Sequence, residues 1–302
     1  MKPTAVTTIF EGPVPPDALH GDVRLSPAKA AWALGMYGTA LFGGWLTFAW
    51  DAFLVFVVST VVTLCLGHSL GMHRRFIHAS FQCPRWLEYF LVHQGVMVGL
   101  AGPYGMVRAH DMRDWAQRQP ACHPFFSQQG GVFKDWFWQL FCEVRLVRPP
   151  VFVLEPRMQR DPVHRFMEAT WRLQQLPLAL LLFACGGWAY VVWGTAVRVS
   201  VSITGHWLIG YFAHNGGRRN WHVEGAAVQG YNIPFTALLT MGENWHNNHH
   251  VFPGSAKLGL KQGELDPGWL VLCLLKRFGL VWNLRTPEQL APRPEVKPLS
   301  AL

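Results

Sequence analysis

The sequence predicts an all-α integral membrane protein, with four transmembrane helices in two hairpins and a cytoplasmic helical cap that holds a histidine-rich site. Half of the 302 residues are hydrophobic and only 15% are charged, which is apolar for a soluble protein. The apolar residues are gathered in two long blocks, and most of the 14 histidines lie just outside these blocks. Together these features favour a membrane protein over a soluble one.

Both apolar blocks are long enough to cross a membrane twice. Asp51 divides the first block and Gly194 divides the second, so that each half approaches or reaches the roughly 20 residues that a helix needs to cross a bilayer. The alternative, buried helices in a large soluble protein, is disfavoured by the placement of charge described next. The four predicted spans are Ala30–Trp50, Ala52–Gly71, Leu176–Trp193 and Thr195–Ala213.

Positive charge is concentrated between the two hairpins. Nine arginine and lysine residues fall within residues 74–148, whereas the turns inside both hairpins carry almost no charge. By the positive-inside rule this segment, both termini and the histidine-rich site are cytoplasmic, in a bacterial inner membrane or an equivalent multi-pass location. The net charge of +8 is then explained by anionic lipid, and no nucleic-acid partner is expected because no basic-aromatic module is present.

The predicted membrane domain spans residues 30–285. Residues 1–29 are expected to form a loose cytoplasmic tail, because they are rich in proline and polar residues and lack the long apolar core of a signal peptide. Residues 286–302 are expected to form a C-terminal tail. The six cysteines are scattered without a CxxC pair, so neither a disulfide framework nor a thiolate metal site is indicated.

Histidines follow the predicted hairpins at the ends that face the cytoplasm. His68, His73 and His78 lie at the end of the first hairpin, and His206 and His214 lie at the end of the second. If both hairpins have their free ends on the same side of the membrane, these segments become neighbours in space. Distant parts of the chain are therefore predicted to build one site.

The segment "GENWHNNHH" contains His246, His249 and His250, which fall within about 100° of arc on a helix. Three imidazoles on one face are expensive to desolvate without a metal or hydrogen-bond partners, so we predict a metal site. His73 and His78 would lie about 140° apart on an α-helix. They reach one ion only if the helix ends or bends there; otherwise they serve two ions.

The types of the candidate ligands limit which metal ion is expected. Imidazole combined with some carboxylate suits iron, and a pair of irons is a common biological device for activating dioxygen. Zinc competes because imidazole binds it well. However, seven or more candidate ligands exceed the needs of a single tetrahedral ion.

Two segments resemble the histidine boxes of the membrane fatty acid desaturase family, in particular its stearoyl-CoA-desaturase-like branch. The stretch "HRRFIH", from His73 to His78, is similar to the first box, HRxxxH, and "GENWHNNHHVFP" is similar to the third box, GExxHNxHHxFP. "AHNGGRRNW" resembles the HxxGxRxY/W segment of the family, which implies that His214 is an additional ligand. The resemblance covers residues 30–285, which it identifies as a membrane fatty acid desaturase domain.

The second box departs from the family pattern, HxxHH. In "GPYGMVRAHDMRDW" His110 takes the first position, but Arg113 and Asp114 stand where two histidines belong. Arginine cannot ligate a cation, whereas Asp114 lies four residues after His110 on the same helical face and can. Arg113 is expected to pair with Asp111 or to hold a carboxylate of the site.

A second departure concerns Gly210, which stands four residues before His214, where the family has an asparagine. His68 and His206 are candidate replacements, because an ionisable side chain inside an apolar span is a functional hypothesis by default. Alternatively, both hydrogen-bond to a neighbouring helix. The predicted metal ligands are His73, His78, His110, His214, His246, His249, His250, Asp114 and His68.

The resemblance implies that two iron ions use O2 to introduce a double bond into a fatty acyl chain, presented as acyl-CoA, on an acyl carrier or in an acyl lipid. The sequence shows neither a cysteine cluster for iron–sulfur nor a haem-type domain, so electrons are expected from a separate ferredoxin, rubredoxin or cytochrome. The altered second box leaves two alternatives open. These are an acyl hydroxylase, acetylenase or decarboxylase on the same scaffold, and a non-catalytic desaturase-like membrane protein with a degenerate metal site.

Overall fold

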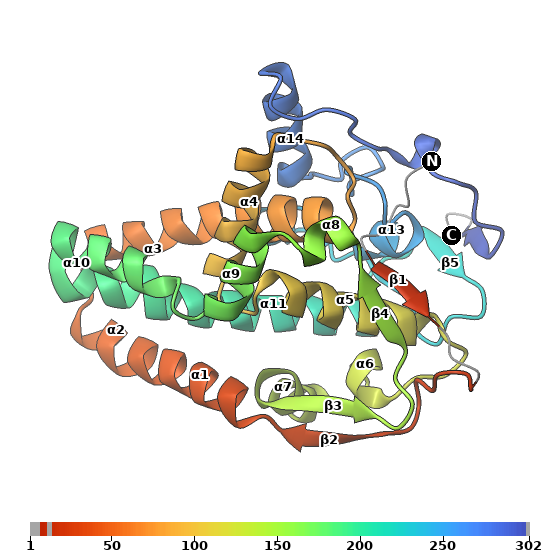
Figure 1. The fold of residues 1–302 in the computed structure, drawn as a ribbon, viewed down its shortest axis with the longest axis horizontal. Helices are drawn as coiled ribbons and strands as arrows, with labels where there is room; N and C mark the ends of the chain where they lie inside the picture. The colour runs from red at the N-terminus through yellow and green to blue at the C-terminus, as the bar shows by residue number, and fades with distance from the viewer. Residues whose placement is uncertain (1–6, 11–13, 300–302) are drawn as a thin grey trace.

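The computed structural model describes residues 7–10 and 14–299. It is mostly helical, as predicted, but the all-α prediction omitted three small two-stranded antiparallel sheets. The long helices lie side by side and extend to one side of the molecule, and the shorter elements form a cap at the other side (Figure 1). The cap therefore gathers the segments that follow the two hairpins.

The first predicted hairpin is present, with its turn a few residues before the predicted position. Its second helix changes from α-helical to π-helical hydrogen bonding part of the way along and ends at the first histidine segment. This helix is long and apolar enough to cross a membrane. The elements are α1 (Pro27–Gly38), η1 (Thr39–Gly43), α2 (Gly44–Leu46), α3 (Trp50–Val62) and η2 (Thr63–Ile77).

The second predicted hairpin is also present, but the predicted turn at Gly194 is wrong. The backbone is non-helical at Gly186 and Gly187, and the φ of 64° at Gly187 favours glycine. Gly194 lies inside a helix, where an added Cβ would come 2.6 Å from the Leu182 side chain, so its smallness permits close packing. The elements are α10 (Gln175–Val191), η3 (Val192–Val197) and α11 (Arg198–Asn215).

Polar contacts join the tips of the two hairpins and brace the second hairpin internally. At the tips, the Tyr190 hydroxyl donates to Asp51 Oδ2 at 3.2 Å. Arg198, the charge that interrupts the second apolar block, is buried, and it donates to Gln175 Oε1 at 2.6 Å and to the Gly194 carbonyl at 2.7 Å. Its charge is therefore solvated by protein oxygen atoms where water is absent.

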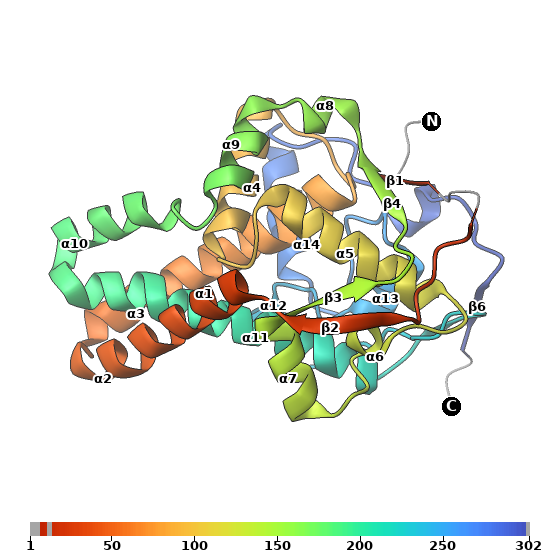
Figure 2. The ribbon, with the colours of Figure 1, turned by 60° about the horizontal axis from the view of Figure 1, so that its bottom comes forward.

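Shorter helices surround the base of the hairpins and form most of the cap (Figure 2). Several begin with proline at the first helical position, where its missing N–H has no helical partner to lose. The remaining helices are α4 (Arg85–Met97), α5 (Pro103–Arg118), α6 (Pro124–Ser127), α7 (Val132–Phe141), α8 (Pro156–Gln159), α9 (Pro162–Thr170), α12 (Ala237–Thr240), α13 (His246–Val251), α14 (Pro267–Arg277) and the 3-10 helix η4 (Pro287–Gln289).

Strands from both predicted tails pair with the cap. The prediction of a loose N-terminal tail is wrong for its described part, because β1 and β2 each pair with a strand more than 100 residues away; residues 1–6 and 11–13 lie outside the described residues. A strand of the predicted C-terminal tail likewise pairs with the segment after α11. The pairs are β1 (Thr7–Phe10) with β4 (Val151–Leu154), β2 (Gly21–Leu25) with β3 (Cys142–Leu146) and β5 (Trp221–Val223) with β6 (Val296–Pro298).

A buried ion pair fixes the first histidine segment to the C-terminal part of the cap. The Arg74 guanidinium donates to the two carboxylate oxygens of Asp266 at 2.8 and 3.2 Å and to the Ala256 carbonyl at 2.8 Å. Asp266 also caps α14 by accepting the backbone N–H of Trp269 at 2.9 Å. The Arg74 and Asp266 side chains are only 1% and 2% exposed, so each neutralises a charge that would be costly alone.

Asp266→Ala is expected to destabilise the protein by about 3–5 kcal/mol, because it leaves the Arg74 charge unpaired in the interior. The measurement is unfolding of the detergent-purified protein, followed by tryptophan fluorescence. Glu224→Ala is the control, since Glu224 pairs with Lys297 at 3.7 Å where both side chains are more than half exposed; it should cost less than about 1 kcal/mol. Equal effects of the two variants would contradict the role assigned to Arg74.

Candidate metal centre

The π-helical end of η2 brings His73 and His78 to the same side of the helix. The backbone N–H of His78 donates to the carbonyl of His73 at 3.1 Å, which is the i→i+5 bond of a π-helix. One turn therefore separates the two residues, whereas an α-helix would place them about 140° apart. The helix also ends at this point, with His78 as its C-cap. His73 and His78 could reach one ion only if the helix ended or bent between them, and this geometry meets that condition.

Seven of the nine predicted ligands come together in two groups. Their ligand atoms lie within 4.8 Å of one another inside each group, and the side chains come from the end of η2 and from α5, α11 and α13. The first group consists of His73, His78, His110 and His249, and the second consists of His214, His246 and His250.

The Nε2 atoms point at one another within each group. In the first group, the Nε2 atoms of His73 and His249 are 3.2 Å apart. In the second, His246 Nε2 lies 3.0 Å from His214 Nε2 and 2.9 Å from His250 Nε2. Two nitrogens bound at right angles to one ion, each at an ordinary imidazole–metal distance of about 2.1 Å, would be about 3 Å apart. The spacing thus fits imidazoles that share an ion.

Burial favours the neutral form of these rings. It lowers the pKa of His246 and of His249 well below the ordinary value, and neighbouring histidines lower both further. Burial likewise lowers the pKa of His250 to about 4. Because neutral imidazole is the form that binds metal, each of these rings has one unprotonated nitrogen that can act as a ligand at neutral pH.

Glu243, one turn before His246 in the same segment, holds the ring of His73. Its Oε2 lies 2.5 Å from His73 Nδ1, and its Oε1 accepts a hydrogen bond from the Ser69 hydroxyl at 2.6 Å. Burial raises the pKa of Glu243, but His73 and Arg74 outweigh this effect and lower it to about 2. The carboxylate is therefore ionised, and it directs Nε2 of His73 toward the first group.

Two further histidines are held in the same way through Nδ1. His110 Nδ1 lies 3.2 Å from Asp111 Oδ1, and His214 Nδ1 lies 2.8 Å from Gln128 Oε1. The sequence analysis assigned no such role to Glu243, Asp111 or Gln128. Asp111 and Glu243 lie inside the histidine segments, so their carboxylates could have been predicted to orient a nearby imidazole ring. Gln128 lies in a different segment, and no sequence pattern distinguishes it.

Asp114 lies beside the two groups without belonging to either. Its Oδ1 is 4.0 Å from His110 Nε2, and its Oδ2 accepts a hydrogen bond from Arg118 at 3.3 Å. Burial raises the pKa of Asp114, but His110 and Arg118 outweigh it and hold the pKa far below its usual range. Asp114 lines a cavity of about 140 Å³ together with residues of both groups, among them His73 and His246.

His68 and Arg113 have different surroundings from those expected. His68 lies outside both groups, with its ring centre 4.9 Å from that of His206, and the two rings line the wall of the same cavity. Arg113 donates to Gln139 Oε1 on α7 at 2.8 Å, a partner that the sequence did not indicate. The structure therefore does not bring His68 to ligand distance of either group.

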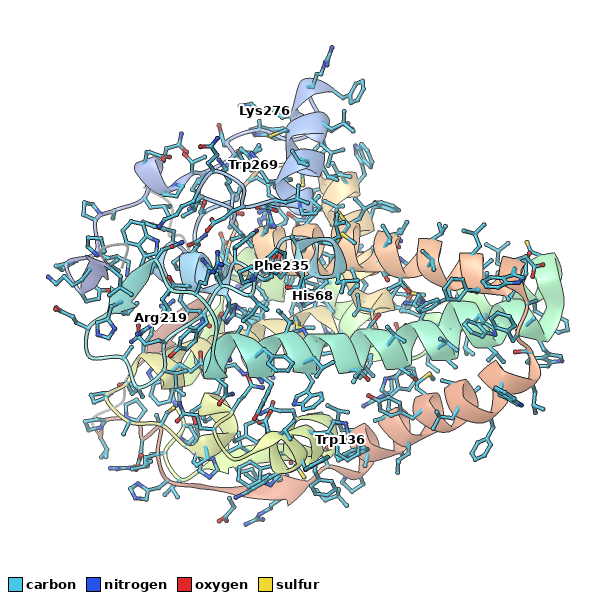
Figure 3. All side chains as sticks on the ribbon, turned by 180° about the vertical axis from the view of Figure 1, so that it is seen from behind. His68, Trp136, Arg219, Phe235, Trp269 and Lys276 are labelled. Atoms are coloured by element: carbon cyan, nitrogen blue, oxygen red, sulfur yellow. The ribbon has the colours of Figure 1, made fainter. Side chains whose placement is uncertain are left out.

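A larger apolar cavity of about 500 Å³ adjoins the metal centre. It is lined by α3, η2, α11 and the segment around α12, and it shares His68, His206, Ile209 and Glu243 with the cavity between the histidine groups. Figure 3 shows His68 in the region where the long helices meet the cap. The histidine groups thus lie beside a cavity formed mainly by hydrophobic side chains.

Comparison with known proteins identifies the family. Residues 48–261 match the family model of the fatty acid desaturases. The chain is 34% identical over 243 residues to the sn-1 stearoyl-lipid 9-desaturase of Anabaena variabilis, which covers 80% of this chain and 87% of that protein. It is 30% identical over 250 residues to the sn-2 palmitoyl-lipid 9-desaturase of Nostoc sp. (strain 36), a match that covers 81% of this chain and 85% of that protein. It is 29% identical over 247 residues to the acyl-CoA C20 Delta5-desaturase of Anemone leveillei, a match that covers 82% of this chain and 78% of that protein. The chain therefore belongs to the fatty acid desaturase family, and it is an oxidoreductase.

Glu243→Gln is expected to weaken metal binding at the first histidine group by about 10–100-fold, because the amide is a poorer acceptor for the His73 ring. The measurement is metal affinity of the purified protein by competition with a chelator. Glu168→Gln is the matched control, since Glu168 accepts the backbone N–H groups of Tyr104 and Gly105 and belongs to neither histidine group. Unchanged affinity in Glu243→Gln would remove the role given to this carboxylate.

Proposed function

We propose that the protein is a membrane-bound, oxygen-dependent di-iron desaturase that introduces a double bond into a fatty acyl chain. The observation that carries the proposal is the pair of buried histidine groups, with converging Nε2 atoms, beside an apolar cavity. The names of its relatives support an acyl substrate, since they specify stearoyl-lipid, palmitoyl-lipid and C20 acyl-CoA. The carrier here is acyl-CoA, an acyl carrier or an acyl lipid.

The residues present suit two irons. Seven imidazole nitrogen donors and a nearby carboxylate make a ligand set typical of iron. The chemistry supplied by a bound iron pair is the reduction of O2 with two electrons and two protons, coupled to removal of two hydrogens from adjacent methylenes, which gives an alkene and two waters. One ion would be held by His73, His78, His110 and His249, and the other by His214, His246 and His250, with Asp114 as a further ligand.

The apolar cavity would hold the acyl chain. It follows η2 and α3 from His68 back to Phe56, twelve residues or about 18 Å of helix. Its lining keeps water away from the methylenes and leaves them few alternative positions. The inner end, at His68, His206 and Glu243, borders the cavity between the two histidine groups. A chain seated there would present an interior methylene pair to the metal centre.

The hairpins would cross the membrane as four spans, with the cap in the cytoplasm. Both tips carry exposed apolar side chains such as Trp45, Trp50 and Trp188, which suit the interior and interface of a bilayer. The histidine groups lie at the opposite ends of these helices, on the side to which the positive-inside rule assigns the arginine-rich segment between the hairpins. Electrons would come from a separate ferredoxin, rubredoxin or cytochrome that reaches the cap from the cytoplasm.

Iron content tests the metal part of the proposal. Elemental analysis of detergent-purified protein should give about two irons per chain. Asp114→Ala should lower that number, because it removes a carboxylate next to His110, whereas Asp114→His restores a family ligand and should keep it. Asp22→Ala, at an exposed residue paired with Arg24, is the control. Two irons retained in Asp114→Ala would mean that Asp114 is not a ligand.

The chemical identity of the product distinguishes a desaturase from a hydroxylase and from a non-catalytic protein. Mass spectrometry of fatty acids from cells that express the protein should show the loss of two hydrogens. A gain of one oxygen would instead indicate a hydroxylase, and the altered residues at 113 and 114 are the reason to look for it, because a carboxylate ligand changes the charge of the site. Absence of any product together with zero or one metal per chain would indicate a degenerate scaffold.

The far end of the apolar cavity should limit the length of the acyl chain. Val57→Phe fills this end and should shift products toward shorter chains, whereas Phe56→Ala opens it and should admit longer ones. The measurement is the chain-length distribution of the unsaturated products. Leu54→Ala, on the same helix but 60% exposed, is the control. If Val57→Phe leaves the distribution unchanged, the acyl chain does not extend to this end of the cavity.

A further inference from the structure

Gln128 is a buried residue that touches the second histidine group from outside. It ends α6, its side chain is 1% exposed, and its backbone has a left-handed conformation, with φ 56° and ψ 23°. That conformation is uncommon for residues other than glycine and is retained only where surrounding contacts hold it. The backbone carbonyl of Gln128 accepts a hydrogen bond from Asn215 Nδ2 at 3.0 Å, which fixes the residue to the end of α11.

The hydrogen bonds of Gln128 determine which nitrogen of His214 carries the proton. Gln128 Nε2 donates to Asp135 Oδ2 at 3.1 Å, and because a carboxylate only accepts, the amide must have its NH2 on that side. The amide oxygen therefore faces His214 Nδ1 at 2.8 Å, and it can only accept. Nδ1 of His214 must carry the proton. Nε2, which faces His246 Nε2 at 3.0 Å, is left as a lone pair for a metal.

Gly210 makes room for this amide. A Cβ added at Gly210 would come 3.2 Å from Gln128 Oε1 and 3.6 Å from Gln128 Nε2, so any longer side chain there would compete with the glutamine for the same space. The family pattern has asparagine at position 210. An asparagine at position 210 would therefore compete for the space that the Gln128 amide fills in this chain.

The same network involves Arg113, which stands at a ligand position of the family pattern. Asp135 also accepts hydrogen bonds from Trp207 Nε1 at 2.8 Å and from Gln139 Nε2 at 3.2 Å. Gln139 Oε1 in turn accepts a hydrogen bond from Arg113 at 2.8 Å. The buried Asp135 carboxylate is thus linked to the partly buried Arg113 guanidinium through one amide. This arrangement offsets its charge and keeps the acceptor for Gln128 in place.

We propose that Gln128 is a positioning residue for His214, which fixes the ring and its tautomer for the second metal ion and replaces the asparagine that is missing at position 210. The proposal rests on the two-metal part of the proposed function and deepens it. Gln128 acts through His214 and is not itself a ligand. Arg113, Gln139 and Asp135 hold the glutamine in turn, so Arg113, which stands at a ligand position of the family pattern, supports the site instead of ligating the metal.

The test is a double-mutant cycle read by metal binding. Gln128→Ala should weaken binding of the second ion by about 10–100-fold, with little change at the first. Gly210→Asn should also weaken it, because the new side chain meets the Gln128 amide. The double variant, in which alanine vacates that space for the asparagine, should recover most of the loss. The probe is Co²⁺, whose visible absorption reports the coordination of each ion, and the titration is done on metal-free purified protein.

Gln175→Ala is the matched control, since Gln175 is a buried glutamine that is hydrogen-bonded to Arg198 and belongs to neither histidine group. Unfolding of the metal-free variants shows whether Gln128→Ala has a merely structural effect. A loss of stability with both affinities unchanged would overturn the proposal, as would a double variant that binds no better than the single ones. Two bound ions without any desaturated product would contradict the proposed reaction and leave the role of Gln128 intact. A wild-type protein that binds no second ion would overturn both.

Discussion

The close approach of seven imidazoles is the constraint on which the rest of the structure depends. Ring nitrogens that both carry lone pairs repel one another at about 3 Å unless a cation lies between them or one of them carries its ring proton, and burial lowers the pKa of His246 and His249 so that neither ring is doubly protonated. The fold must therefore hold these rings in place before any metal arrives. Each supporting contact around the site can be understood as part of that task.

Three kinds of support share this work. The π-helical end of η2 places His73 and His78 on one side, and the Arg74–Asp266 pair fixes that end to the C-terminal part of the cap. A second kind acts on single rings through Nδ1, as Glu243 does for His73. The third is the hydrogen-bonded network that reaches His214 from α5 and α7. Together these contacts distribute the positioning of the closely spaced imidazoles over several helices, so that no single loop has to hold them.

The sequence predicted most of the site because each histidine segment is local. The spacing in "WHNNHH" requires only that residues 246–250 form a helical turn, and α13 does so. The general architecture was also predictable, since two apolar blocks of this length leave few options other than long helices. The errors came where a local signal was ambiguous. Gly194 was predicted to form a turn, but it lies inside a helix and permits close packing. The N-terminal tail was predicted to be loose because its strand partners lie far along the chain.

The sequence by itself determined the family, the helical hairpins and most of the candidate ligand residues, because these follow from composition and from short-range spacing. Only the tertiary structure decided how those residues are shared between two groups, that His68 lies outside both, and that Asp114 lies beside them. It also decided the contacts of Arg113, Gln128 and Gly210, because Arg113 meets Gln139 on α7, and Gln128 lies against Gly210 on α11, only after folding. The physical reason is that a hydrogen-bond network among distant elements leaves no periodic trace in the chain, whereas a turn of helix does.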